Sequence, residues 1–389
     1  MGIRLQILLI SLAALSYHQY QIINPLLVEW VPDNDIDFTK INNYICSTAP
    51  GFENLGKMPG SEDIEISKKH KLAFVTVGLR YPMGEMESYN MKIEEHEPKF
   101  KGIYVYDLKE ETLNEPIKLE FDDVSPHGIS LIDVDDKVIR VAFNSHARGF
   151  HYENPGEEEL IIFDYDIKLK EVIFTSRIPI KSETVFVNDI AWRSESSLYL
   201  SNDHGYARFE PEGSFFNTLL FNLEFILPIP QKCKVQYLEL EKDLKLIKSI
   251  KTVYDGGRMG NGVLIQDGYL VMAETLGTVV NRFRILDNGD LDKINDLKFD
   301  TVLDNLSVDE NGDLLLSGIT NAPKHISVRK SDDPKTPKGY VIKLKPDLSE
   351  YVVIHTHADK GISTAATWNN ENSMLIGAPD FPLEYCTKS

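Results

Sequence analysis

A short pattern recurs six times along the 389-residue chain, and it constrains the fold more than any other feature. In each copy, one or two polar residues precede a short strand of alternating apolar and polar residues, and a turn and a second apolar strand follow. The copies recur at intervals of about 40 to 70 residues, which indicates a repeat architecture. We call the polar starts the heads; they begin at Glu62, His127, Asn188, Asn261, Asp304 and, more weakly, Ser363.

The repeat predicts an all-β fold, a six-bladed β-propeller that forms one domain over residues 41–389. The innermost strand of each blade runs beside the central axis of a propeller. The heads are therefore expected to converge on one central tunnel, while the apolar residues that follow them pack between blades. Further apolar segments fit the outer strands, at residues 102–106, 159–163, 235–238 and 339–342.

Residues 1–40 are interpreted as an N-terminal signal or membrane-surface segment and a lead-in. Arg4 precedes an apolar run over residues 5–15, and small residues lie near the end of this run at Ala13 and Ala14, as in a secretory signal. The run is shorter than the roughly 20 residues that span a bilayer. Apolar patches continue to residue 31, so a retained helix on a membrane surface stays open as the alternative. Either alternative places the chain in the secretory pathway, extracellular or membrane-associated.

The three cysteines agree with that compartment. Cys46 precedes the first head and Cys386 lies near the end of the chain. Because the first and last blades of a ring are neighbours, we expect a disulfide between these two residues that closes the ring, with Cys233 left free. Such a bond requires an oxidising compartment.

The net charge of −19 at pH 7 makes nucleic acid an unsuitable partner. A nucleic-acid-binding protein needs a basic surface that neutralises phosphates, and the sequence contains no basic stripe.

The heads are rich in carboxylates and carboxamides, and they contain one imidazole and no thiol. Oxygen ligands of this kind suit Ca²⁺, which accepts six to eight of them, whereas softer metals prefer Cys or several His. Successive strand residues differ in direction, so we expect two groups of ligands at different depths. The charges suffice for two dications. The candidate side chains are Glu62, Asp63, Asn188, Asp189, Asn261, Asp304 and Asn305.

With these motifs the chain resembles the serum paraoxonase/arylesterase family, six-bladed propellers with two central calcium ions. The resemblance covers roughly residues 45–386 and includes the terminal cysteine pair. The matching motifs, in order, are Gly60-Ser61-Glu62-Asp63, Pro126-His127-Gly128-Ile129-Ser130, Asn188-Asp189-Ile190, Asn202-Asp203-His204, Asn261-Gly262 and Asp304-Asn305-Leu306-Ser307-Val308-Asp309.

The resemblance implies a calcium-dependent hydrolase of lactones and aryl esters, with a small-molecule ester or lactone as substrate. Of its two calcium ions, the upper one would polarise the substrate carbonyl. His127 matches the active-site histidine, the expected general base, and His146 falls where its partner should be. The implied ligands are Glu62, Asn188, Asn261, Asp304 and Asn305 for the catalytic ion, and Asp63, Asp189 and the backbone carbonyl of Ile129 for the buried one.

Other interpretations remain open. A membrane-associated paraoxonase-like protein without catalysis, acting in assembly or as a chaperone, would keep the ligands for stability. A gluconolactonase-like or phosphotriesterase-like propeller with one calcium ion is a further candidate, but the second acidic pair and the terminal cysteines favour the paraoxonase pattern. The apolar segment 213–230 has two interpretations. It fits ordinary packing within a blade, and by the resemblance it lies where the family has an amphipathic segment beside the active-site mouth, where an exposed apolar patch would favour lipid surfaces.

Overall fold

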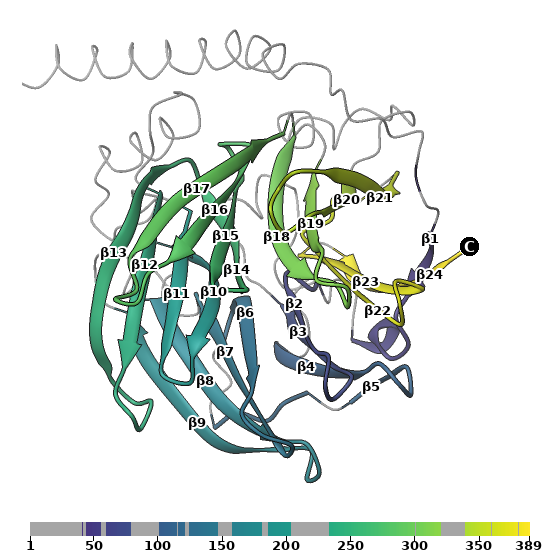
Figure 1. The fold of residues 1–389 in the computed structure, drawn as a ribbon. Helices are drawn as coiled ribbons and strands as arrows, with labels where there is room; N and C mark the ends of the chain where they lie inside the picture. The colour runs from purple at the N-terminus through teal and green to yellow at the C-terminus, as the bar shows by residue number, and fades with distance from the viewer. Residues whose placement is uncertain are drawn as a thin grey trace, which may run out of the picture.

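The computed structural model is a ring of six antiparallel sheets, each with four strands (Figure 1). It describes residue 41 and residues 44–55, 60–78, 101–114, 116–120, 124–146, 158–180, 186–203, 233–299, 301–319, 339–358, 360–379 and 381–389. The predicted all-β, six-bladed β-propeller is therefore confirmed. The predictions for residues 1–40 and for the apolar segment 213–230 lie outside the described residues.

Each blade follows chain order from its innermost strand outward, except the last. The strands of the first three blades are β2 (Ile64–Ser67), β3 (Leu72–Val77), β4 (Gly102–Asp107) and β5 (Thr112–Leu113); β6 (Pro126–Asp133), β7 (Val138–Ser145), β8 (Glu158–Asp166) and β9 (Glu171–Ile180); and β10 (Val187–Ser194), β11 (Ser197–Asn202), β12 (Cys233–Leu240) and β13 (Ile247–Gly257).

The remaining blades repeat this arrangement, and a short 3₁₀ helix, η1 (Phe52–Asn54), follows β1. Their strands are β14 (Gly260–Gln266), β15 (Tyr269–Glu274), β16 (Val279–Ile285) and β17 (Leu291–Lys298); β18 (Val302–Val308), β19 (Leu314–Ile319), β20 (Gly339–Leu344) and β21 (Tyr351–His357); and β22 (Thr364–Trp368), β23 (Ser373–Ala378), β24 (Phe381–Lys388) and β1 (Tyr44–Thr48).

The ring closes within the last blade. β1, from the N-terminal side, pairs antiparallel with β24 at the C-terminus and forms the outer edge of that blade. Cys46 and Cys386 lie opposite each other in this pair and form a disulfide with an S–S distance of 2.06 Å. The predicted disulfide is present, but it joins two strands of one blade rather than two neighbouring blades, because the N-terminal strand completes the last sheet.

The hydrophobic core lies between blades, as the alternation in the sequence predicts. Between the first two blades, Phe74 of β3 packs with Phe143 and Phe163 of the second blade, and none of the three is exposed. Leu264 and Tyr340 belong to the corresponding cluster between the fourth and fifth blades. Because each blade is stabilised by its two neighbours, the packing holds the six inner strands beside one axis.

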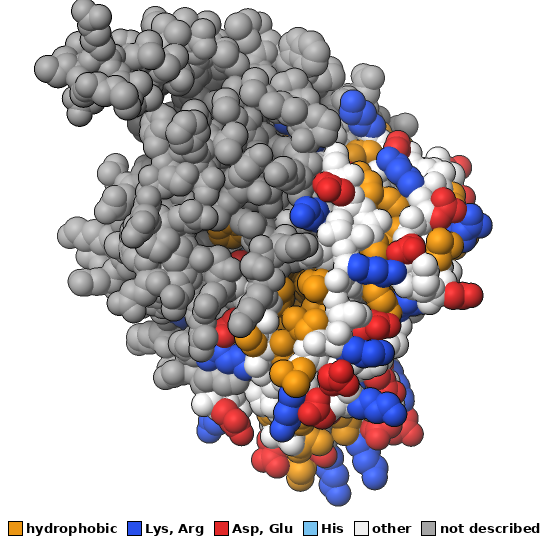
Figure 2. Space-filling model, turned by 90° about the vertical axis from the view of Figure 1, so that its left-hand side faces the viewer, with side chains coloured by type: hydrophobic (Ala, Val, Ile, Leu, Met, Phe, Trp, Pro, Cys, Tyr) orange, Lys and Arg blue, Asp and Glu red, His pale blue; other side chains and the backbone are white. Residues whose placement is uncertain are grey.

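On the described part of the face in Figure 2, Lys and Arg side chains lie among those of Asp and Glu, with apolar side chains between them. A surface that carries both charges in this way suits contact with water better than contact with phosphate groups. Among the described residues, none forms a helix of the length and apolar character that a membrane crossing needs.

Replacing both disulfide cysteines, Cys46→Ser with Cys386→Ser, is expected to lower the free energy of unfolding by about 5 kcal/mol, because the bond closes a loop of 340 residues. Urea unfolding of the double variant measures this, after peptide mapping without reductant has verified the bond in the parent protein. Cys233→Ser is the control, with an unchanged midpoint. An unchanged midpoint in the double variant would show that strand pairing alone closes the ring.

Candidate active site and metal centre

The heads lie at the starts of the innermost strands, and backbone irregularities position them. The strand register shifts between the first two strands of four blades at the head itself: between Pro126 and Ile129, Val187 and Ile190, Gly260 and Val263, and Leu303 and Leu306. Such bulges insert a residue and re-aim side chains. Two successive head residues can therefore both face the central tunnel. A regular strand, in which successive side chains point to opposite faces, would not allow this.

Glycines let neighbouring heads approach closely. A Cβ atom on Gly128 would lie 2.5 Å from Asp189 Cα, and one on Gly262 would lie 2.6 Å from Asn305 Cα. Both distances are shorter than real Cβ contacts allow, so only glycine fits at these two positions. The glycines in the second and fourth heads thus allow the inner strands to converge.

Glu62 connects heads that are far apart in the sequence. Its Oε1 accepts a hydrogen bond from Asn305 Nδ2 (2.9 Å) and lies 3.4 Å from His127 Nε2. Its backbone oxygen accepts from Ser363 Oγ (2.8 Å) in the weak sixth head. Residues of the first, second, fifth and sixth blades therefore meet around one buried carboxylate, 3% exposed. The structure brings these predicted residues together.

The second-position aspartates tie adjacent blades to one another. Asp63 Oδ2 accepts from Ile129 N–H of the second blade (3.0 Å), and Thr364 Oγ1 donates to Asp63 Oδ1 (3.2 Å). Asp189 Oδ2 accepts from Val263 N–H of the fourth blade (2.7 Å). Both aspartates are buried. Backbone N–H groups of the neighbouring blades hold both carboxylates, which we call the second layer of oxygens.

The carboxylates of the heads are crowded and desolvated. Burial, and next the charge of Glu62, raise the pKa of Asp63 to about 7. Burial and Asp63 raise the pKa of Asp189 well above its usual range, and burial and Glu62 do the same for Asp304. Without a cation, these groups oppose one another's ionisation. A bound cation would remove that conflict.

Several buried oxygens of the heads have no hydrogen-bond donor. Three of them are Glu62 Oε2, Asn188 Oδ1 and Asn305 Oδ1. The amide of Asn305 donates to Glu62, which leaves its oxygen facing elsewhere. Buried polar atoms normally have partners, and all three of these atoms are acceptors. A set of orphaned acceptor oxygens among raised-pKa carboxylates fits a hard cation such as Ca²⁺.

In the described residues, the three Cys, His, Asp or Glu ligand atoms that lie within 4.8 Å of one another belong to Cys46, His355 and Cys386. The disulfide uses both of those sulfurs, so they cannot ligate a metal as thiolates. The carboxylates of the heads form no cluster that tight. Oxygens on opposite sides of Ca²⁺ lie roughly 5 Å apart, and the amide oxygens belong to the same shell.

His127 and His146 form a hydrogen-bonded pair at the head of the second blade. His127 Nδ1 lies 2.6 Å from His146 Nε2. The pKa of His127 is raised: burial is the largest single effect and opposes its protonation, but the charge and hydrogen bond of Glu62 and the charges of Asp203 and Glu158 together outweigh it. Burial, and next His127, lower the pKa of His146 to about 3, so His146 stays neutral. The predicted pairing of these two histidines is present in the structure.

The sequence motifs did not reveal every residue that supports the site. Glu158, the first residue of β8, contacts His146 Nδ1 through both carboxylate oxygens (2.9 and 2.8 Å). Hydroxyls on second strands hold the backbone of the acidic heads: Thr76 Oγ1 accepts from Asp63 N–H (2.8 Å), and Ser201 Oγ accepts from Asp189 N–H (3.1 Å). A signal was present for Glu158, since two glutamates, Glu158 and Glu159, precede the apolar run at the centre of β8.

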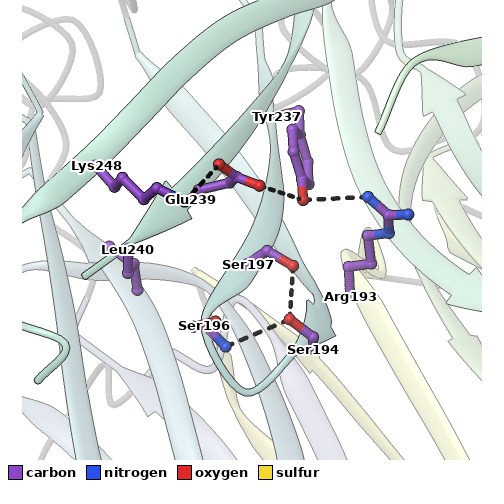
Figure 3. A pocket seen from close by; sticks show the side chains of 8 residues that line it. All are labelled: Arg193, Ser194, Ser196, Ser197, Tyr237, Glu239, Leu240 and Lys248. Carbon is purple, nitrogen blue, oxygen red and sulfur yellow. Dashed lines mark hydrogen bonds and ion pairs between the residues drawn. The ribbon is translucent and has the colours of Figure 1, made fainter. Parts of the chain in front are cut away.

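A separate pocket of about 310 Å³ lies on the third blade (Figure 3). Its polar groups are occupied by one another: Arg193 donates to Tyr237 Oη (3.1 Å), and Lys248 lies 3.6 Å from Glu239. It contains none of the head residues, so it is not the candidate site.

His204 of the Asn202-Asp203-His204 motif and the apolar segment 213–230 lie outside the described residues.

Comparison with known proteins identifies the family. The chain belongs to the arylesterase family, whose model matches residues 46–387. It is 28% identical to human serum paraoxonase/arylesterase 1 over 359 residues, which cover 88% of each protein, and 29% identical to human serum paraoxonase/arylesterase 2 over 343 residues, 84% of this chain and 85% of that protein. The rat protein named serum paraoxonase/lactonase 3 is 26% identical over 359 residues, again 88% of each.

Solved structures support the fold. A putative gluconolactonase aligns with a TM-score of 0.50 at 12% identity, covering 92% of this chain and 97% of that one. A gluconolactonase from Xanthomonas campestris also aligns with a TM-score of 0.50 at 12% identity, covering 90% and 91%. At this identity, the two similarities concern the propeller fold alone.

Proposed function

We propose that this protein is a calcium-dependent hydrolase of lactones and aryl esters, with His127 as the general base. Membership of the arylesterase family and the names of its relatives support ester and lactone hydrolysis. The observation that carries the proposal is the juxtaposition of His127 Nε2 with the Glu62 carboxylate, 3.4 Å away, in a ring of orphaned acceptor oxygens.

The head residues would hold two calcium ions. Glu62, Asn188, Asn261, Asp304 and Asn305 supply the oxygens for one, and Asp63, Asp189 and the backbone carbonyl of Ile129 supply those for the other, more deeply held ion. When bound, calcium supplies Lewis-acid polarisation of an ester carbonyl.

His127 is suited to accept a proton from water. Its Nδ1 is engaged with His146, so Nε2 is the nitrogen left for chemistry. Nε2 lies beside Glu62, one of the proposed calcium ligands, and the His127 side chain is 13% exposed. A neutral imidazole in this position can take the proton of a water molecule that adds to the carbonyl carbon. His146, which remains neutral, orients the ring and passes the proton on.

The disulfide supports the further proposal that the protein passes through the secretory pathway, since such bonds persist in oxidising compartments. Release from the cell or retention on a membrane surface would depend on residues 1–40.

A panel of lactones and aryl esters, assayed with the purified protein, tests the proposed activity. We expect turnover of at least one lactone or aryl ester, and no turnover after heat inactivation. Hydrolysis of no member of the panel would favour a non-catalytic role in assembly or chaperoning, in which the ligands serve stability alone.

Calcium binding is expected to release protons, and to release more at about pH 6 than at about pH 8. Without metal, the pKa of Asp63 is raised to about 7, so this carboxyl is largely protonated at the lower pH and ionised at the higher one. A carboxyl group must lose its proton before it ligates. Calorimetric titration in two buffers of different ionisation enthalpy measures the release at each pH. Equal release at both values would exclude Asp63 from the site.

A further inference from the structure

Glu158 is a buried carboxyl group that contacts one imidazole, that of His146. It opens β8, its side chain is 1% exposed, and its two oxygens lie 2.9 and 2.8 Å from His146 Nδ1. The next residue, Glu159, differs: its carboxylate binds Arg177 through Nε (2.8 Å) and Nη2 (2.6 Å). A carboxylate that is buried against an imidazole fixes the tautomer and orientation of that imidazole.

Glu158 completes a continuous row of titratable groups. His146 presents Nδ1 to Glu158 and Nε2 to His127 Nδ1, at 2.6 Å, and His127 presents Nε2 to Glu62. A neutral imidazole carries one N–H, so each ring donates on one side and accepts on the other. When Glu158 is ionised and the proposed calcium ion engages Glu62, His146 Nδ1–H donates to Glu158, His127 Nδ1–H donates to His146 Nε2, and His127 Nε2 carries the lone pair.

We propose that Glu158 is the positioning residue that orders this row and receives the proton at its far end; this inference rests on the proposed function of His127 as the base. When water adds to the carbonyl carbon, its O–H bond breaks and the proton goes to His127 Nε2. The Nδ1 proton of His127 passes to His146 Nε2, and the Nδ1 proton of His146 passes to Glu158. Glu158 becomes a carboxylic acid, and both imidazoles end neutral.

The reverse sequence returns the proton to the leaving oxygen as its bond to the carbonyl carbon breaks. No oxidant or second substrate is needed, because one proton is moved and restored within each turnover. The row therefore serves as base for the addition and as acid for the departure.

The electrostatics of the site agree with this role. Burial, and next the charge of Asp203, raise the pKa of Glu158 well above its usual range; Glu159 acts in the same direction and His127 in the opposite one. Burial, and next His127, lower the pKa of His146 to about 3. A proton shared between His146 and Glu158 is therefore held by Glu158, and the row accepts a proton from water in those molecules in which Glu158 is ionised.

Glu158→Gln tests the proposal with little change of volume. Glutamine can still accept from or donate to His146 Nδ1, but it cannot take up a proton. We expect kcat to fall at least about 10-fold with KM, melting temperature and calcium content unchanged, and Glu158→Asp to recover part of the loss. Glu159→Gln, the adjacent buried glutamate, is the matched control, with kcat within about twofold of the parent. Parent-like kcat in Glu158→Gln would overturn the proposal.

A second measurement does not depend on enzymatic turnover. Imidazole ¹⁵N shifts of the parent protein, assigned with His146→Asn, report which nitrogen carries the proton. The proposal requires Nδ1–H on both His146 and His127, and a proton on His146 Nε2 would overturn it whatever the kinetics show. If the parent hydrolysed no ester or lactone, the proposed function would fail, while the tautomers would still decide the order of donors in the row.

Discussion

Replacing His127 with glutamine is expected to remove most ester and lactone hydrolysis while leaving the fold and the bound calcium in place. The loss should be about 10²- to 10⁴-fold in kcat, which is the usual contribution of a general base. Glutamine is similar in size and can keep a hydrogen bond to His146, so the tunnel wall stays filled, but it cannot accept the proton of water. Steady-state kinetics with the best lactone of the panel measure the effect.

His70→Gln is the matched control for this variant. His70 lies in the turn after β2, at the opposite end of the first blade from Glu62, and its Nε2 is 3.8 Å from Asp133. His70→Gln therefore removes a histidine that lies near a carboxylate but away from the heads. The activity of this variant should match that of the parent. Unchanged activity in His127→Gln would place the base elsewhere.

Asp189→Ala is expected to reduce stability rather than rate alone. The variant loses the acceptor for the N–H groups of Ile190 and Val263, both at 2.7 Å, and it would also lose a ligand of the proposed deeper calcium site. Two buried donors and a neighbouring carboxylate, Asp63, are left uncompensated. We expect the free energy of unfolding to fall by about 3 to 5 kcal/mol. Urea unfolding in excess calcium measures this loss.

Asp290→Ala serves as the comparison, because Asp290 also accepts hydrogen bonds but is 48% exposed and paired with Lys251. Exposed pairs contribute about 0 to 1 kcal/mol, so its midpoint should hardly move. If Asp189→Ala were as stable as Asp290→Ala, the second layer of oxygens would have no structural role. Parent protein in chelator should approach the stability of Asp189→Ala.

The repeat in the sequence predicted the inner part of each blade and the heads. The inner strands have a strong signal because both of their faces are buried, as in β3, where all six residues are buried. The outermost strands β5, β9, β13, β17 and β21 were not predicted. In β17 the sequence is LDKINDLK and half of its residues are exposed, so charged side chains mask the alternation. Only packing against β16 makes that segment a strand.

The heads were predicted as sets of residues, but their geometry was not. The sequence pattern of a head shows two polar residues in succession. The bulge that allows both to face the tunnel depends on how the innermost strand pairs with the second strand of its blade. No sequence motif connects Glu158 with His146. The two residues come into contact because β7 and β8 are paired. The disulfide partners were predicted from ring closure, yet their position in one blade depends on how β1 completes the sheet.

Calcium content and activity measured on the same sample test the central claim most directly. The purified protein would be dialysed, analysed for metal, stripped with a chelator and then titrated with Ca²⁺ while lactone or aryl ester hydrolysis is followed. We expect two calcium ions per chain after dialysis, loss of hydrolysis when the more weakly held ion is removed, and recovery as that ion returns. Full hydrolysis by protein that contains no calcium would contradict the account.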